Sequence, residues 1–149
     1  MDYLSEGGFN QEEPKKMLLD INSCFATIEQ QANPLLRGKE VVVAAYENGG
    51  GCILAASKEA KKLGIKTGWR VGEAKKICPN IVVLTPDVEK YRFVNRGLKK
   101  ILLEFCPKVQ SKSIDEFAMD FTGVNGNLKE IALEIKKEIK EKLGEWITV

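Results

Sequence analysis

Two long amphipathic segments constrain the fold of this chain more than any other feature. In residues 87–105 the apolar side chains recur every three or four positions, which predicts a helix with one buried face. Pro86 and Asp87 are typical of its start, and Pro107 ends it. Residues 128–143 show the same spacing, with lysine and glutamate on the opposite face, so we expect a second such helix.

Short apolar runs predict the strands that accompany these helices. The runs lie at residues 17–19, 109–113, 117–121 and 146–149. Either Asn22 or Ser23 is expected to cap a further helix that begins at Cys24. The resulting order is βαββαβ, which indicates an α+β protein with a ferredoxin-like sheet and helices on one face. Polymerase palms use this core, and so do many unrelated proteins.

A small mixed α/β lobe is predicted as an insertion in this core. Residues 41–45 and 52–56 are apolar runs on either side of a glycine-rich turn, which favours a hairpin. We expect Ser57 to cap a helix that ends at Gly64, followed by a helix at 71–77 and a strand at 81–84. The predicted organisation is a flexible tail at 1–13, the lobe at 24–86, and a core at 14–23 and 87–149.

Composition excludes several kinds of chemistry. The chain has no histidine, so a His-based triad, zinc site or general base is ruled out. Its four cysteines form no Cys-x-x-Cys pair, which favours reduced, buried thiols over zinc ligands. No apolar run reaches 18 residues, and the start lacks a basic and then apolar leader, so we expect a cytoplasmic protein with no membrane partner.

Positive charge is concentrated in the inserted lobe. The net charge is only +2, but residues 57–76 hold seven basic and two acidic side chains. A local excess of this kind favours a partner that carries phosphate groups. The alternative is an ordinary solvated helix face.

Acidic residues stand at two unusual places. Asp20 ends the first apolar run, and Asp115 and Glu116 are adjacent at the start of another strand. We expect the first strand to lie beside the strand after the first helix, which would bring these carboxylates together. Three converging carboxylates suit two divalent cations, and Mg²⁺ prefers such oxygen ligands. A helix cap at Asp20 and a hairpin corner at Asp115 and Glu116 are the alternatives.

Several motifs, in order, resemble those of Y-family (translesion, DinB/UmuC-like) DNA polymerases. Residues 19–29, Leu-Asp-Ile-Asn-Ser-Cys-Phe-Ala-Thr-Ile-Glu, are similar to the opening motif of that family. Residues 33–43 resemble its Asn-Pro-x-Leu-x-Gly-Lys-Pro-Val-x-Val stretch, and residues 59–65 resemble its Glu-Ala-Arg-x-Phe-Gly-Val. Residues 113–116 match its Ser-Ile-Asp-Glu. The resemblance covers about residues 17–149.

The resemblance implies a role for each matching residue. Asp20, Asp115 and Glu116 match the catalytic metal ligands, and the carbonyl of Ile21 would complete the shell of one of two Mg²⁺ ions, with Mn²⁺ as a substitute. The turn that holds the incoming triphosphate matches Asn22, Ser23, Cys24 and Phe25. Phe25 matches the steric gate that excludes a ribose 2′-hydroxyl, and plain core packing is its alternative.

Three further nucleotide-binding positions depart from the common pattern. Ala55, Lys58 and Lys61 stand where many relatives have Thr, Tyr and Arg. The two lysines keep positive charge without the planar fork of arginine. Residues 51–61 resemble the UmuC-like branch more than the DinB-like branch.

As a whole, the resemblance implies the N-terminal palm and fingers of a translesion DNA polymerase that acts in DNA damage bypass and repair. The core at 14–23 and 87–149 would be the palm, and residues 24–86 the fingers. The implied partners are primer–template DNA, an incoming dNTP and, through a region beyond residue 149, a sliding clamp. We expect a longer parent protein, associated with the nucleoid when active, and little activity from residues 1–149 alone. A palm-like nucleotide cyclase and a non-catalytic nucleic-acid-binding module are the alternatives.

Overall fold

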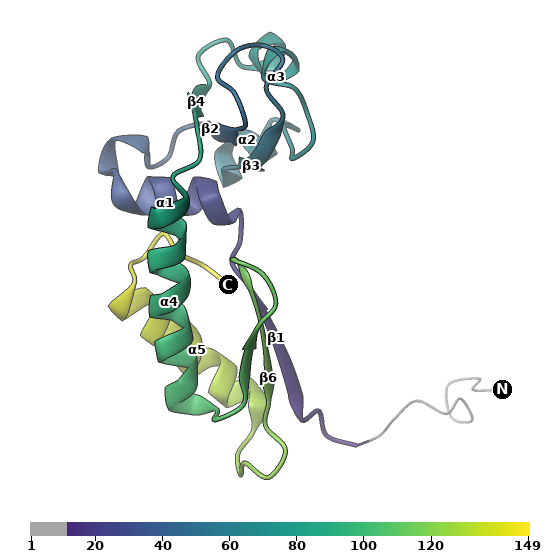
Figure 1. The fold of residues 1–149 in the computed structure, drawn as a ribbon, viewed down its shortest axis with the longest axis vertical. Coiled ribbons are helices and arrows are strands. Elements are labelled where there is room, and N and C mark those ends of the chain that lie inside the picture. Colours follow the sequence, from purple (N-terminus) through teal and green to yellow (C-terminus); the bar gives the residue numbers. More distant parts are fainter. Residues whose placement is uncertain (1–11) are drawn as a thin grey trace, which may run out of the picture.

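Helix α1 (Cys24–Ala32) lies between two lobes in the computed structural model, which describes residues 12–149 (Figure 1). The larger lobe contains β1 (Lys16–Asp20), α4 (Val88–Phe105), β5 (Val109–Ser111), β6 (Glu116–Asp120) and α5 (Leu128–Lys142). The smaller lobe contains β2 (Val41–Ala44), β3 (Ile53–Ala56), α2 (Lys58–Lys62), α3 (Val71–Ile77) and β4 (Val82–Leu84). A 3₁₀ turn, Pro34–Leu36, follows α1. The predicted tail falls mostly on residues 1–11, which lie outside the described residues.

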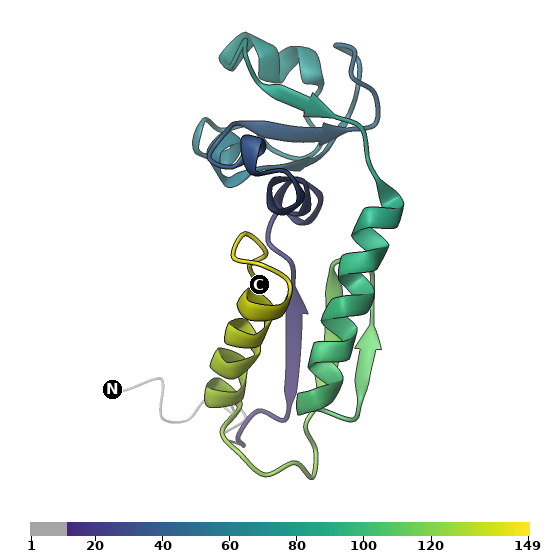
Figure 2. The same ribbon diagram turned by 90° about the vertical axis from the view of Figure 1, so that its left-hand side faces the viewer.

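The sheet of the larger lobe has the strand order β1-β6-β5, and both pairs are antiparallel. Helices α4 and α5 cover one of its faces (Figure 2). The predicted α+β fold is confirmed, but the predicted neighbour of β1 is wrong, because β1 pairs with β6 and not with β5. Residues 146–149 were expected to be a strand and are not one; instead the Thr148 carbonyl accepts a 2.9 Å hydrogen bond from the Asn22 amide.

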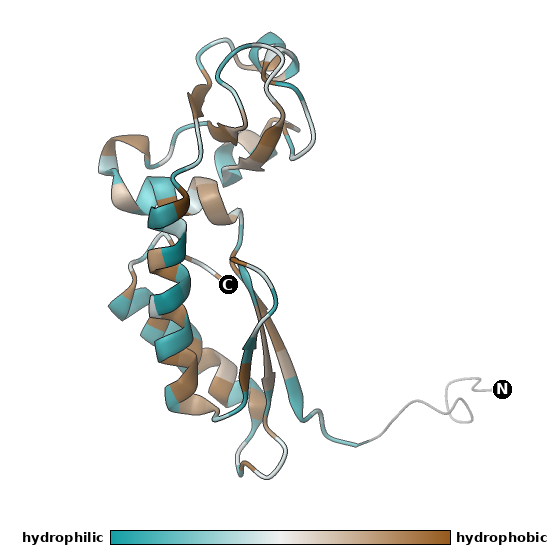
Figure 3. Cartoon of the chain, viewed as in Figure 1, coloured by the Kyte–Doolittle hydropathy of each residue, from teal (hydrophilic) through white to brown (hydrophobic). Residues whose placement is uncertain are grey.

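Side chains along the strands of the larger lobe alternate between a face that packs on the core and an open face. Leu19 of β1 lies opposite Phe117 of β6, and both are buried beneath the helices. Leu18 points the other way and is 79% exposed. The apolar stripes of α4 and α5 turn toward the strands, while their outer faces are hydrophilic (Figure 3). Asp87 caps α4, as predicted, by accepting a hydrogen bond from the Lys90 amide.

The smaller lobe has a sheet of its own. The predicted hairpin is confirmed as the antiparallel pair of β2 and β3, and β4 lies parallel to the other edge of β2. Ser57 caps α2, as predicted, and its hydroxyl also accepts a 3.1 Å hydrogen bond from the Val41 amide. Alanine at positions 26 and 55 lets α1 pack closely on this sheet beside Val43.

The entry into α1 differs from the prediction. The N-cap residue is Ser23, and its side chain makes no capping hydrogen bond in the described structure. Its backbone has φ 51°, in the left-handed region, whereas a capping residue is normally extended. The side chain of Asn22 instead donates to the Thr148 hydroxyl. A sharp turn, and not a side-chain cap, therefore joins β1 to α1.

Candidate active site

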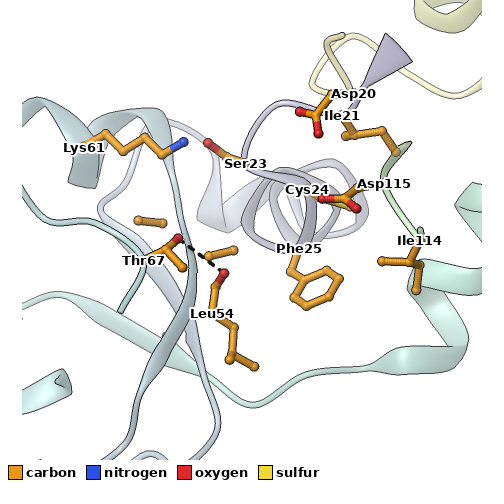
Figure 4. Close-up of a pocket in the computed structure, with 12 residues that line it drawn as sticks. Asp20, Ile21, Ser23, Cys24, Phe25, Leu54, Lys61, Thr67, Ile114 and Asp115 are labelled. Carbon is orange, nitrogen blue, oxygen red and sulfur yellow. Dashed lines mark hydrogen bonds between the residues drawn. The ribbon is translucent and has the colours of Figure 1, made fainter. Parts of the chain in front are cut away.

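A pocket of about 280 Å³ opens where the end of β1, the start of α1 and strand β3 meet (Figure 4). Eight of the predicted site residues line it: Asp20, Ile21, Ser23, Cys24, Phe25, Ala55, Lys61 and Asp115. Three others, Asn22, Lys58 and Glu116, do not. The structure therefore brings together most of a site whose members come from four separate segments of the chain.

Hydrogen bonds to backbone carbonyls fix the segments that carry the two aspartates of this pocket. The Ile21 amide donates to the Asp115 carbonyl oxygen at 2.9 Å, which ties the end of β1 to the turn between β5 and β6. Asn95 of α4 donates to the Ile114 carbonyl at 2.8 Å and holds the same turn from the other side. Because Asp115 lies in the turn, it is not bound by the alternation of the strand and can face Asp20.

Glu116 is the first residue of β6 and lies directly opposite Asp20 in the strand register. Side chains directly opposite in an antiparallel pair lie on the same face of the sheet. Glu116 is therefore on the open face, next to Asp20 and outside the lining of the pocket. Among residues 12–149, no three His, Cys, Asp or Glu side chains are grouped closely enough to count as a metal site.

The electrostatics of the pocket leave negative charge partly uncompensated. Burial raises the pKa of Asp20, the Asp115 carboxylate raises it further, and Lys61 opposes both effects. Burial also raises the pKa of the Cys24 thiol, with help from Asp115 and Asp20, to about 12. Cys24 is thus a neutral thiol near pH 7 and is suited neither to nucleophilic attack nor to metal binding.

These carboxylates fit a divalent cation. The Asp115 charge raises the cost of ionising Asp20, and a cation beside Asp20 would offset that cost. Carboxylate oxygens are the ligands that Mg²⁺ prefers. Glu116 stands one strand away as a third oxygen donor on the same face. The donor set therefore matches a hard cation and not a zinc ion.

The opposite wall of the pocket suits an anion. Lys61 projects from α2 toward Ser23 and the first turn of α1 (Figure 4). The first amides of a helix have no partner within the helix and point out from its start. Ser23 is the one residue other than glycine with positive φ among residues 12–149, and it sets the direction of this turn. The pocket therefore has an acidic side and a basic side.

Lys58 faces elsewhere, although it is three residues from Lys61. It lines a separate pocket of about 320 Å³ with Thr27, Trp146 and Thr148. Four residues that line the main pocket were not predicted from the sequence: Leu54, Ala56, Thr67 and Ile114. Leu54 is the single exposed position in β3, so its place in the strand alternation could have identified it.

Known proteins resemble this chain over a stretch that includes the residues of the pocket. The model of the impB/mucB/samB family matches residues 19–149. A DNA polymerase IV of Pelotomaculum thermopropionicum is 39% identical over 132 residues, which are 86% of this chain and 33% of that protein. The DNA polymerase IV 1 of Bacillus subtilis is 39% identical over 126 residues, which are 84% of this chain and 30% of that protein. The chain thus spans about a third of the length of these relatives.

Solved structures give the same family. DinB from Sulfolobus solfataricus superposes with a TM-score of 0.79 at 34% identity, covering 89% of this chain and 40% of that one. An insertion ternary complex of Dbh DNA polymerase superposes with a TM-score of 0.80 at 33% identity, with the same coverage of 89% and 40%. The closer likeness to the UmuC-like branch stays a prediction. From its sequence, fold and site, the chain belongs to the impB/mucB/samB family, within the Y-family of DNA polymerases.

Proposed function

We propose that this chain forms the palm and fingers of a translesion DNA polymerase, which transfers a nucleotide from a dNTP to a primer 3′-hydroxyl. The palm is assigned to residues 14–23 and 87–149, and the fingers to residues 24–86. The observation that carries the proposal is the two-sided pocket, with Asp20 and Asp115 on one side and Lys61 on the other. A nucleotidyl transfer site needs both a cation site and an anion site.

Each wall of the pocket is assigned a task. Asp20, Asp115, Glu116 and the Ile21 carbonyl would hold two Mg²⁺ ions, for which Mn²⁺ can substitute. Bound there, such ions would lower the pKa of the attacking hydroxyl and offset charge on the phosphates. The amides of residues 22–25, with Lys61, bind the triphosphate beside Ala55. Lys58, which lines the neighbouring pocket, is assigned a smaller part through its positive charge. Phe25, which borders the pocket, is assigned the role of steric gate against a ribose 2′-hydroxyl.

The wider setting belongs to the same proposal. Primer–template DNA and a dNTP are the partners, and the role is DNA damage bypass and repair in the cytoplasm, at the nucleoid. Sliding-clamp contact and most of the grip on DNA are assigned to regions of the relatives that this chain does not cover. Residues 12–149 contain no helix that is long and apolar enough to cross a membrane.

A nucleotide titration tests the proposal. Isothermal titration calorimetry would measure the binding of dNTP and rNTP, each with and without Mg²⁺, to the wild-type chain and to Asp115→Ala. We expect Mg²⁺-dependent binding that favours dNTP and is lost in Asp115→Ala, while the far-UV circular dichroism spectrum is kept. Asp120→Ala is the matched control, since Asp120 lies at the far end of β6. Equal binding by Asp115→Ala and the wild type would reject the metal assignment.

A further inference from the structure

The ring of Phe25 is stacked on a second ring that belongs to the palm. Its centroid lies 4.3 Å from that of Tyr91, and the two planes differ by only 10°. Phe25 borders the pocket, whereas Tyr91, in the first turn of α4, is fully buried. Tyr91 therefore forms a floor beneath Phe25, and the place of the Phe25 ring depends on that of Tyr91.

Tyr91 is itself held by a buried carboxylate. Its hydroxyl donates a 2.9 Å hydrogen bond to Oε1 of Glu29, and the Lys90 ammonium lies 2.7 Å from Oε2. Glu29 is only 6% exposed, an unusual place for a glutamate unless it is paired. Both groups that pair with it come from α4, whereas Glu29 itself is in α1, one helical turn beyond Phe25.

We propose that Glu29 is a positioning residue for sugar selectivity, acting through Tyr91 on Phe25. The inference rests on the proposed function, in which Phe25 is the steric gate. Glu29 and Phe25 are four residues apart on the same helix, so Tyr91 is gripped by α1 at two points, its hydroxyl and its ring face. Two contacts fix both the tilt and the depth of the Tyr91 ring, and the ring in turn limits how far Phe25 can retreat from a 2′-hydroxyl.

Removing the carboxylate should loosen this arrangement. A buried hydroxyl that loses its acceptor is costly, so the Tyr91 ring would shift to find a new partner. Phe25 would then follow its stacking partner away from the pocket. The metal side of the pocket should stay intact, because the backbone bond from Ile21 to Asp115 involves neither Glu29 nor Tyr91.

Four variants test the proposal through the ratio of dNTP to rNTP affinity in the presence of Mg²⁺. Glu29→Leu and Tyr91→Phe both remove the hydrogen bond, and each should lower the ratio about threefold to tenfold. Glu29→Gln keeps an acceptor oxygen for Tyr91 and should keep most of the selectivity. Gln30→Leu is the matched control, because Gln30 is an equally buried polar residue of α1 whose side chain bonds to Glu59, Leu36 and Lys39.

The outcomes are decisive in both directions. An unchanged ratio in Glu29→Leu overturns the proposal, and so does an equal loss in Gln30→Leu, which would mean a general structural role. A loss in Glu29→Gln as large as that in Glu29→Leu would place the effect in the Lys90 ion pair and would also overturn it. A wild-type chain with no preference for dNTP would instead contradict the proposed gate function.

NMR spectroscopy tests the inference even if the wild-type chain shows no preference for dNTP. The Phe25 ring protons lie over the face of Tyr91, so their NMR chemical shifts carry a ring-current displacement that reports the stacking. The signals are assigned by their loss in Phe25→Leu. We expect them to move toward ordinary values in Glu29→Leu and to stay in place in Gln30→Leu. Unmoved signals in Glu29→Leu would show that Glu29 does not position the rings.

Discussion

The Ile21 amide donates a 2.9 Å hydrogen bond to the Asp115 carbonyl oxygen, and this bond ties the turn that carries Asp115 to the strand end that carries Asp20. Burial and the Asp115 charge raise the pKa of Asp20, whose ordinary value is 3.8. A raised pKa means that folding favours the protonated acid, so this contribution to stability is present at low pH and lost as the pH rises through the raised pKa. Without metal, we expect Asp20→Asn to unfold at a higher urea concentration than the wild type at pH 7 and at the same concentration at pH 3.

Asp120 provides a control of the opposite sign. Hydrogen bonds from Thr122 hold the pKa of Asp120 below its usual range, so the ionised carboxylate stabilises the fold at neutral pH. This stabilisation is lost as the pH falls through the lowered pKa. Asp120→Asn should therefore be less stable than the wild type at pH 7. If Asp20→Asn were also less stable than the wild type at pH 7, the account of the carboxylate pair would be wrong.

Lys58 and Lys61, two of the three lysines of α2, should differ in their effect on nucleotide binding. Lys61 lines the pocket with the aspartates, whereas Lys58 lines the pocket beside Trp146. Loss of one positive charge near a triphosphate is worth about 1 kcal/mol, or roughly fivefold in affinity. We expect Lys61→Met to weaken Mg²⁺–dNTP binding by that factor, and Lys58→Met to weaken it less. Calorimetry at low and high salt checks this, and a larger effect of Lys58→Met would contradict the placement.

A pH-dependent contribution to stability is expected where α1 meets the smaller lobe. Burial tends to raise the pKa of Glu59, but hydrogen bonds from Gln30 and from Ser57 outweigh it and hold the pKa below the ordinary value of 4.5. Glu59→Gln keeps an acceptor oxygen but removes the charge, so it should lower the free energy of unfolding at pH 7 by about 1 kcal/mol, the typical difference between a charged and a neutral hydrogen bond. Because the pKa is lowered, the difference should shrink as the pH falls through it.

Urea titrations between pH 3 and pH 7 measure the Glu59 effect directly. Glu104→Gln is a suitable comparison, since Glu104 makes an exposed ion pair with Lys142 at 3.0 Å. Exposed pairs contribute up to about 1 kcal/mol and are weakened by salt. A Glu59→Gln penalty that stays constant down to pH 3 would disprove the proposed cause.

Gly144 should tolerate a side chain less well than Gly123. Its φ is +121°, and an added Cβ would lie 2.2 Å from the side chain of Gln31. Gln31 accepts a 2.9 Å hydrogen bond from the Trp146 amide, so Gly144→Ala must both strain the backbone and break this contact. Gly123 has φ +81° with no atom within 4 Å of an added Cβ, so Gly123→Ala costs only the strain, about 1–2 kcal/mol. Thermal unfolding followed by far-UV circular dichroism should show the larger loss of stability for Gly144→Ala.

The sequence predicted the parts of the fold that depend on local chemistry. Asp87 and Ser57 cap their helices because a side-chain oxygen meets an amide three residues on, a pattern visible in the sequence itself. The strand expected at 146–149 failed for the opposite reason. A strand exists only where a partner lies beside it, and an apolar run carries no information about its partner.

The sequence predicted which residues form the site better than it predicted where their side chains lie. The spacing of Lys58 and Lys61 puts both on one side of a helix, yet they line different pockets, because α2 is short and a pocket lies at either side of it. Asp115 was expected with Glu116 as one acidic unit. Asp115 lies in the turn and Glu116 begins strand β6, so their side chains point in different directions. Only the tertiary structure shows at which residue the strand begins.

Helix α1 belongs to both cores at once. Ile28 is buried among the residues of the larger lobe, and Ala26 is buried against the sheet of the smaller lobe. The same short helix carries Phe25 and the polar residues that bond to α4 and to α2. No rotation of one lobe against the other can therefore leave Phe25 where it was. A tilt of the smaller lobe would therefore also change the width of the pocket beside Phe25.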